Sequence, residues 1–173
     1  MKKYVSLFLL SLFGLILLSC DTNNNDDNDY DTYSVIYDIT DNFKAGTPYS
    51  ISRSFNSAIP DSDVILVYRL SATDNGAAVW QLLPRTLYLD EGELDYDYDF
   101  TKYDVLIRAG GTINLDSQSS TFKNAYLNNQ TFRIVIVPAS YGRSTNGGGI
   151  DYSDYNSVIK AYGINDRNVK VLQ

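Results

Sequence analysis

The sequence has no histidine and only one cysteine, Cys20, among its 173 residues. Histidine is the side chain that most often transfers protons in enzymes and most often binds transition metals. Its absence excludes a Ser–His–Asp triad and argues against the common zinc sites. With a single cysteine, the chain can form neither an intrachain disulfide nor a cluster of thiolate ligands. The lack of histidine and of a second cysteine therefore argues against the most frequent kinds of catalytic and metal-binding site.

Basic residues and nucleotide-binding motifs are also scarce. Fourteen Lys and Arg against 21 Asp and Glu give a formal net charge of −7, and loss of a leader containing Lys2 and Lys3 would take it to −9. Such a chain is a poor partner for nucleic acid or for anionic lipid. No Gly-x-Gly-x-x-Gly fingerprint occurs, and no Lys-Ser or Lys-Thr follows the glycine-rich residues 146–149. We therefore predict no nucleic acid partner, no cofactor and no metal ion.

The first nineteen residues have the layout of a signal peptide. Lys2 and Lys3 form a positive n-region, and an apolar run extends from Val5 to Leu18. This run is short for a membrane-spanning helix, which needs about 20 apolar residues. A transmembrane anchor is the alternative, and it is disfavoured because the polar stretch begins abruptly at Cys20. We therefore assign residues 1–19 to a signal peptide.

The end of this leader, residues 17–20 (LLSC), resembles the bacterial lipobox, in which a small residue precedes an invariant cysteine. The resemblance implies that the sulfur of Cys20 is joined to diacylglycerol and that cleavage frees its amine for acylation. One acyl chain binds a membrane only marginally, at about 0.8 kcal/mol per buried CH₂, whereas two or three chains attach durably. Cys20 is thus the predicted lipidation site and the predicted link to the membrane.

Residues 20–32 form a predicted flexible, acidic tether. The stretch 21–31 (DTNNNDDNDYD) has one apolar residue, Tyr30, and cannot bury enough surface to fold. An acidic run after an acylated cysteine also resembles the surface-export signal of Bacteroidota lipoproteins, which implies the outer face of the outer membrane. A plain linker with incidental charge is the alternative. A calcium loop is disfavoured, because the central glycine and terminal glutamate of an EF-hand are missing.

Residues 33–173 are predicted to form one domain made mostly of strands. Residues 63–70 (DVILVYRL) and 131–137 (TFRIVIV) are apolar runs of strand length, typical of central strands covered on both faces. Further strands are expected at 33–39, 49–55, 78–83, 86–89, 104–108, 112–115 and 169–172, with loops at 116–129 and 141–150. Turn signals every eight to twelve residues or so predict an antiparallel β-sandwich of about seven to nine strands with one C-terminal helix.

Two segments of this domain carry specific patterns. Residues 95–100 place aromatic side chains on one face and Asp95, Asp97 and Asp99 on the other, after a hairpin loop at 90–92. Three like charges in a row would repel an acidic neighbour, so we expect this strand at a sheet edge. The expected helix has Ser153 as its N-cap and Gly163 after its end, with an apolar stripe at positions 155, 158, 159 and 162.

Candidate site residues are few, and each has two interpretations. Arg69 and Arg133 lie within the two most apolar strands, where they either bind a ligand carboxylate together or are ion-paired structural residues. Trp80 is either a platform for sugar stacking or part of the core. We favour the structural interpretation in both cases. Paired carboxylates among residues 90–99 could hydrolyse glycosides, but these acids look solvated, whereas one of the pair must be desolvated.

Residues 62–69 (SDVILVYR) and 131–138 (TFRIVIVP), together with the lipobox and the acidic tether, resemble a group of small flavobacterial-type envelope lipoproteins of unknown function. Members of such groups sometimes carry the names dihydrolipoamide dehydrogenase or collagen-like protein. Neither name fits, since the first requires a flavin-binding unit and a redox cysteine pair and the second a Gly-x-y tract. The resemblance implies no catalytic residue.

The sequence as a whole favours a lipid-anchored, surface-displayed binding or structural module without catalytic activity. Its ligand would be an envelope protein, a glycan or a host molecule. The alternative is a surface hydrolase that uses carboxylates alone. Buried, closely spaced carboxylates in a deep pocket would favour the hydrolase, whereas exposed acids beside a shallow hollow would favour the binding module.

Overall fold

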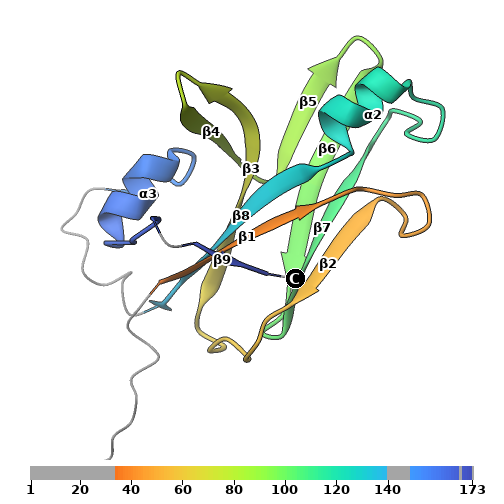
Figure 1. Cartoon of the computed structure of the whole chain (residues 1–173). Helices are drawn as coiled ribbons and strands as arrows, with labels where there is room; N and C mark the ends of the chain where they lie inside the picture. Colours follow the sequence, from red (N-terminus) through yellow and green to blue (C-terminus); the bar gives the residue numbers. More distant parts are fainter. Residues whose placement is uncertain (1–33, 140–148, 168, 173) are drawn as a thin grey trace, which may run out of the picture.

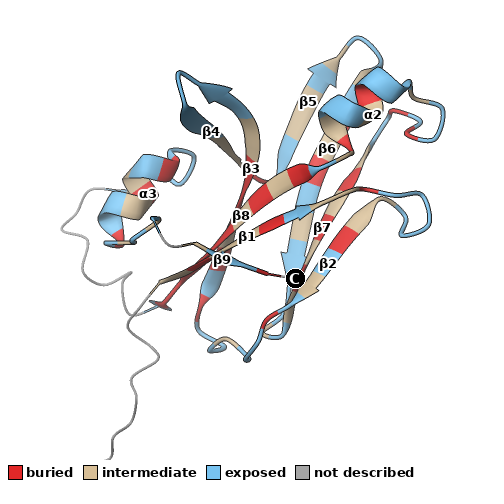
Figure 2. Cartoon of the chain, in the orientation of Figure 1, coloured by how far each residue is buried: buried red, intermediate tan, exposed pale blue. Residues whose placement is uncertain are grey.

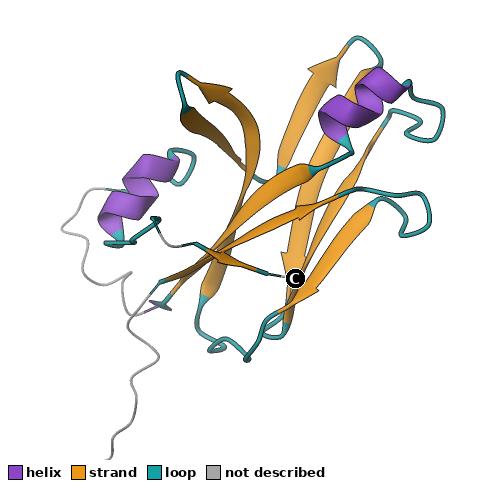
Figure 3. Ribbon diagram, in the orientation of Figure 1, coloured by secondary structure: helices purple, strands orange, loops and turns teal. Residues whose placement is uncertain are grey.

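The computed structural model describes residues 34–139, 149–167 and 169–172, which form two packed sheets and two short helices (Figures 1 and 3). The strands are β1 (Val35–Asp41), β2 (Ser50–Ser54), β3 (Val64–Asp74), β4 (Ala77–Leu82), β5 (Arg85–Leu89), β6 (Gly92–Phe100), β7 (Asp104–Gly111), β8 (Gln130–Val137) and β9 (Lys170–Val171), and the helices are α2 (Ser120–Tyr126) and α3 (Tyr155–Ala161). The predicted mainly-β, sandwich-like fold with a helix near the C-terminus is confirmed.

One sheet has the strand order β4-β3-β8-β1-β9 and the other the order β2-β7-β6-β5. Every pairing is antiparallel except that between β1 and the two-residue β9, which is parallel. The apolar runs at 63–70 and 131–137 supply β3 and β8, which both lie inside the five-stranded sheet. Their prediction as central strands is therefore confirmed.

Two apolar clusters explain why β3 and β8 are hydrophobic on both faces. Figure 2 shows buried positions on strands of both sheets. The main core lies between the sheets and includes Ile65, Val67, Phe132 and Ile134. A second cluster lies on the outer face of the five-stranded sheet and consists of Ile36, Tyr68, Val135, Val137, Tyr155, Val158 and Tyr162. Its last three members belong to α3 or follow directly after it, so the helix covers this outer face.

The prediction that residues 95–100 form an edge strand is wrong, because β6 lies between β5 and β7. Neighbouring strands compensate its charges. Arg108 on β7 bonds to Asp99 at 2.5 Å and lies 3.4 Å from Asp97. The hydroxyl of Thr86 on β5 donates to Asp95 at 2.5 Å. Cross-strand partners of this kind allow an acidic face in the middle of a sheet.

The structure also corrects two assignments between residues 112 and 129. Residues 112–115 do not form a strand, since Gly111 has a φ of +114° and the N–H groups of Thr112 and Ile113 both point to the carbonyl of Glu93. Residues 120–126, predicted as loop, form α2. The hydroxyl of Ser119 caps this helix by accepting a hydrogen bond from the N–H of Phe122 at 3.1 Å.

Helix α3 was predicted within residues 153–163, and its end at Gly163 is confirmed by a φ of +59°. Its N-cap is Asp154 rather than Ser153, because the Asp154 carboxylate accepts from the N–H of Asn156 at 3.0 Å. Of the predicted stripe, Tyr155, Val158 and Tyr162 are buried, whereas Ile159 is half-buried. Most of the predicted 141–150 loop lies outside the described residues.

Candidate functional site

The structure separates the two strand arginines. Tyr68 lies opposite Arg133 in the β3–β8 register, and Arg69 lies opposite Phe132. Successive residues of a strand point to opposite faces of the sheet. Arg69 therefore lies on the inner face with Phe132, and Arg133 lies on the outer face with Tyr68. The two cations do not form a joint carboxylate site, and their structural interpretation holds.

Arg133 links α3 to the five-stranded sheet through hydrogen bonds. Its guanidinium makes two hydrogen bonds to the carboxylate of Asp38, at 2.8 and 2.9 Å, and one to the hydroxyl of Tyr155 at 2.7 Å. Asp166 lies 3.8 Å away, and the ring of Trp80 stacks at 4.4 Å from the guanidinium carbon. Although burial alone would lower the pKa of Arg133, the bonds to Asp38 and Tyr155 raise it. Burial also raises the pKa of Tyr155 to about 12.

Trp80 is a half-buried member of this contact rather than a free platform. Its ring lies 5.7 Å from the ring of Tyr155, and Arg133 covers one of its faces. It packs against the outer cluster of apolar residues. The preferred interpretation of Trp80 as a packing residue therefore agrees with its position.

Arg69 holds the C-terminal end of α2. It is buried, its Nε and Nη2 donate to the side-chain oxygen of Gln130 at 3.0 and 2.7 Å, and Nη2 also lies 3.4 Å from the carbonyl of Ala125. The guanidinium stacks on the ring of Tyr96 at 4.7 Å, and the Tyr96 hydroxyl donates to the carbonyl of Tyr126 at 2.6 Å. A cation beside the last carbonyls of a helix is favourable.

The acidic residues do not form the arrangement that a hydrolase would need. Asp97 and Asp99 are exposed and paired with Arg108, and Asp90 and Glu91 are exposed at the β5–β6 turn. Within residues 34–139, 149–167 and 169–172, Asp63 is the one buried carboxylate. The same segments contain no cluster of three or more residues that could hold a metal ion. Desolvated carboxylate pairs, the observation that would favour hydrolysis, are thus lacking in the part of the chain that is described.

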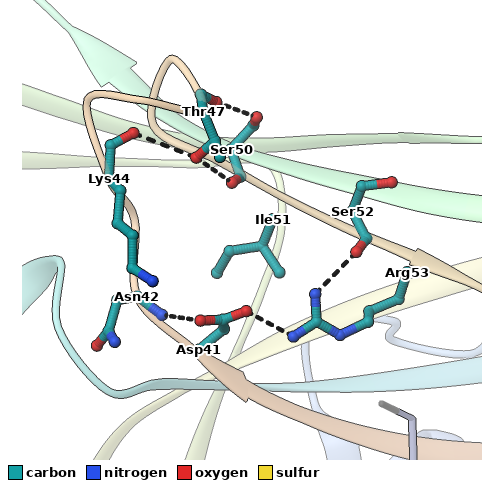
Figure 4. Close-up of a pocket in the computed structure, with 8 residues that line it drawn as sticks. All are labelled: Asp41, Asn42, Lys44, Thr47, Ser50, Ile51, Ser52 and Arg53. Atoms are coloured by element: carbon teal, nitrogen blue, oxygen red, sulfur yellow. Dashed lines mark hydrogen bonds and ion pairs between the residues drawn. The ribbon is translucent and has the colours of Figure 1, made fainter.

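A polar hollow lies where β1 ends and β2 begins (Figure 4). We call it the polar cleft, and it has a volume of about 300 Å³. Its lining residues are Asp41, Asn42, Lys44, Thr47, Ser50, Ile51, Ser52 and Arg53. The two strands belong to different sheets, so the cleft lies on one side of the sandwich, at the seam between β1 and β2.

The loop that connects β1 to β2 is held in place by its own hydrogen bonds. The N–H of Tyr49 donates to the carbonyl of Lys44 at 2.9 Å, and the hydroxyl of Thr47 donates to the carbonyl of Ser50 at 2.9 Å. The Tyr49 hydroxyl donates to Asp116 at 2.6 Å, and this bond raises the pKa of Tyr49 to about 12. The wall of the cleft is therefore largely formed before any ligand arrives.

An ion pair between Asp41 and Arg53 closes one side of the cleft at 2.5 Å and joins the two sheets. This bond, together with the N–H of Asn42 at 2.7 Å, lowers the pKa of Asp41. Arg53 also donates to the carbonyl of Ser52 at 2.8 Å. Its Nε is buried and has no acceptor, an arrangement that costs about 1–3 kcal/mol.

Three polar groups of the cleft are available to a ligand. Among the described residues, the ammonium of Lys44, the side-chain NH₂ of Asn42 and the hydroxyl of Ser52 have no hydrogen-bond or ion-pair partner. Each is a donor, and the hydroxyl is also an acceptor. The cleft can therefore bind a small polar ligand.

Comparisons with protein-family models, curated proteins and solved structures found no match. None of the residues of the polar cleft was singled out in the sequence. Asp41 and Arg53 are twelve positions apart, and the alternating serines of β2 indicate only a solvent-facing strand.

Cys20 and the tether lie outside the described residues. Helices long and apolar enough to cross a bilayer are absent from the described segments.

A second hollow lies on the same side of the sandwich. It has a volume of about 290 Å³ and is lined mainly by apolar residues that include Tyr37, Phe55 and Ile59, with Lys170 of β9 at its rim. The side chain of Leu172, which follows β9, is 4% exposed and belongs to the main core.

Proposed function

We propose that this chain is a lipoprotein of the cell envelope, anchored through lipid at Cys20 and displayed on the outer face of the outer membrane. Its β-sandwich binds a ligand in the polar cleft and has no catalytic activity. The anchor is supported by the positive n-region, the apolar run and the lipobox-like residues 17–20.

Surface display is supported by the acidic residues that follow Cys20. The chain between Cys20 and Ser34 comprises residues 21–33, which span at most roughly 45 Å when fully extended. A strand-rich domain on such a tether can stand clear of the lipid headgroups. The outer membrane assignment rests on the resemblance of the acidic run to a surface-export signal.

The polar cleft is the observation that carries the binding function. Its rigid wall presents three donors without partners, from Lys44, Asn42 and Ser52, and its one carboxylate is already neutralised by Arg53. Its volume of about 300 Å³ lies at the lower end of the range for small-molecule sites. The carboxylate arrangement gives no support to a hydrolase.

The anchor is tested by comparing wild-type protein with Cys20→Ala and, as a control, Asn23→Ala in the tether. We expect the wild type and Asn23→Ala in the membrane fraction with the mass of an acylated N-terminal cysteine. Cys20→Ala should be released or retained as the uncleaved precursor. A mature wild-type chain with an unmodified thiol would refute the lipid anchor. Protease treatment of intact cells then tests display, since a protected domain would place it on the inner face.

A further inference from the structure

The polar cleft carries surplus positive charge although the chain as a whole is acidic. Lys44 and Arg53 contribute two cations and Asp41 one anion. The formal charge of the chain is −7. A local reversal of sign in a hollow concentrates field lines and attracts ligands of the opposite charge. The preferred ligand of this cleft should therefore carry negative charge.

The single carboxylate of the cleft does not prevent this. Both oxygens of Asp41 are engaged, one by Arg53 at 2.5 Å and the other by the N–H of Asn42 at 2.7 Å. Lys44 is left without a carboxylate within ion-pair distance among the described residues, and Figure 4 shows its ammonium in the hollow beside Asn42. An incoming anion can pair with this ammonium without displacing an internal ion pair.

The remaining free groups match a ligand rich in hydroxyls. The hydroxyl of Ser52 and the side-chain NH₂ of Asn42, whose oxygen already accepts from the N–H of Asn129 at 2.6 Å, lie on the cleft wall, while Ile51 is the one apolar lining residue. The NH₂ can donate to a sugar hydroxyl group, and the Ser52 hydroxyl can donate to one or accept from one. The volume of about 300 Å³ accommodates a single sugar ring rather than a large apolar molecule.

We propose that the polar cleft binds the carboxylate-bearing ring of an acidic saccharide, with Lys44 as the principal cation, Asn42 and Ser52 as hydroxyl partners and Arg53 as the group that keeps Asp41 neutralised. This ligand class rests on the proposed binding function and makes it specific.

The test uses the full-length mature protein, purified in detergent, and a matched pair of probes. The probes are trigalacturonate and its methyl ester, which has the same rings without the charge. Calorimetry should detect binding of the acid, weaker binding of the ester, and loss of affinity for the acid as salt rises. Lys44→Ala should lower the affinity for the acid roughly fivefold, the effect of one exposed charge pair.

The variant Asp41→Asn gives a sharper test, because it should raise the affinity for the acid, whereas Lys44→Ala should lower it. Removal of the only negative group in the cleft should raise the affinity for the acid roughly fivefold while leaving the ester unaffected. Asp97→Asn is the matched control, since it removes one arginine-paired aspartate that does not line the cleft and should change the affinity for the acid less than Asp41→Asn does. Circular dichroism and the emission of Trp80 verify that each variant is folded.

Several outcomes would overturn the proposal. Equal affinities for the acid and the ester would show that charge does not contribute to binding. If neither Lys44→Ala nor Asp41→Asn changed the affinity for the acid, the binding site would lie elsewhere. Tighter binding of a short peptide through its C-terminal carboxylate would refute the saccharide class. If neither saccharide binds while Cys20-dependent anchoring holds, the ligand class fails and the anchor stands. If the anchor is missing, the proposed function fails whatever the cleft binds.

Discussion

Replacement of Arg133 by methionine should undock α3 and destabilise the whole domain. The variant Arg133→Met keeps the apolar stem but removes the two bonds to Asp38, the bond to Tyr155 and the stacking on Trp80. The side chain of Arg133 is only 12% exposed and that of Asp38 only 24%. Loss of the guanidinium therefore leaves a largely buried carboxylate without its partner.

The magnitude follows from this burial. Breaking a fully buried ion pair by removing one partner costs about 3–5 kcal/mol, and a stacked cation contributes about 1 kcal/mol more. Because Asp38 keeps some contact with water, we expect the low end, a loss of about 3 kcal/mol in the free energy of unfolding. This is a large share of the roughly 5–15 kcal/mol that stabilises a typical domain.

The chain supplies both its own probe and its own control. Trp80 is the only tryptophan and lies against Arg133 and Tyr155, so its emission should shift to the red when α3 undocks. Arg108→Met removes an arginine that is also paired with two carboxylates but is 41% exposed. It should cost less than about 1 kcal/mol in urea denaturation followed by circular dichroism. Equal losses for the two variants would refute the reasoning from burial.

Two further predictions concern the seam and the tyrosines. Leu172→Ala should lower the free energy of unfolding by about 2–4 kcal/mol in urea denaturation, because its side chain fills the main core, and a loss below about 1 kcal/mol would show that the core is sealed without it. Burial raises the pKa of Tyr96 and Tyr155 to about 12 from an ordinary value of 10.0. Their contribution to stability is complete below pH 10 and is lost as the pH rises towards 12, since the unfolded chain releases these protons first. Unfolding free energies measured across this range should fall together with the appearance of tyrosinate absorbance, and a flat profile would contradict the assignment.

The sequence predicted the elements whose signal is local. Strands β3 and β8 are apolar on both faces, and the structure supplies a cover for each face, with the second sheet on one side and α3 on the other. Helix α3 was recognised from its stripe because Tyr155, Val158 and Tyr162 recur at helical spacing. Helix α2 was missed because Phe122 is its one buried residue, which is too weak a pattern to separate a helix from a polar loop.

Predictions that depended on a neighbouring strand were less secure. The predicted edge position of β6 was wrong because its charges are compensated by Arg108 on β7. The sequence alone does not show that Arg108 pairs with Asp97 and Asp99. The faces of Arg69 and Arg133 follow from the register between β3 and β8, which is set by the packing of the whole sheet. The polar cleft could not be anticipated for the same reason, since Asp41 and Arg53 belong to different sheets.

The position of the cleft follows from how the sandwich is closed. On one side the chain passes directly from β4 into β5, and the buried side chain of Leu83 seals the crossing. On the opposite side the chain passes from β1 into β2 through the longer loop 42–49, and the two-residue β9 pairs with β1 only at Tyr37 and Asp38. Leu172 and the Asp41–Arg53 ion pair join the two sheets along this seam. Two hollows, of about 300 and 290 Å³, lie beside these contacts. A short edge strand and a longer connecting loop thus leave room for a ligand on this side of the sandwich.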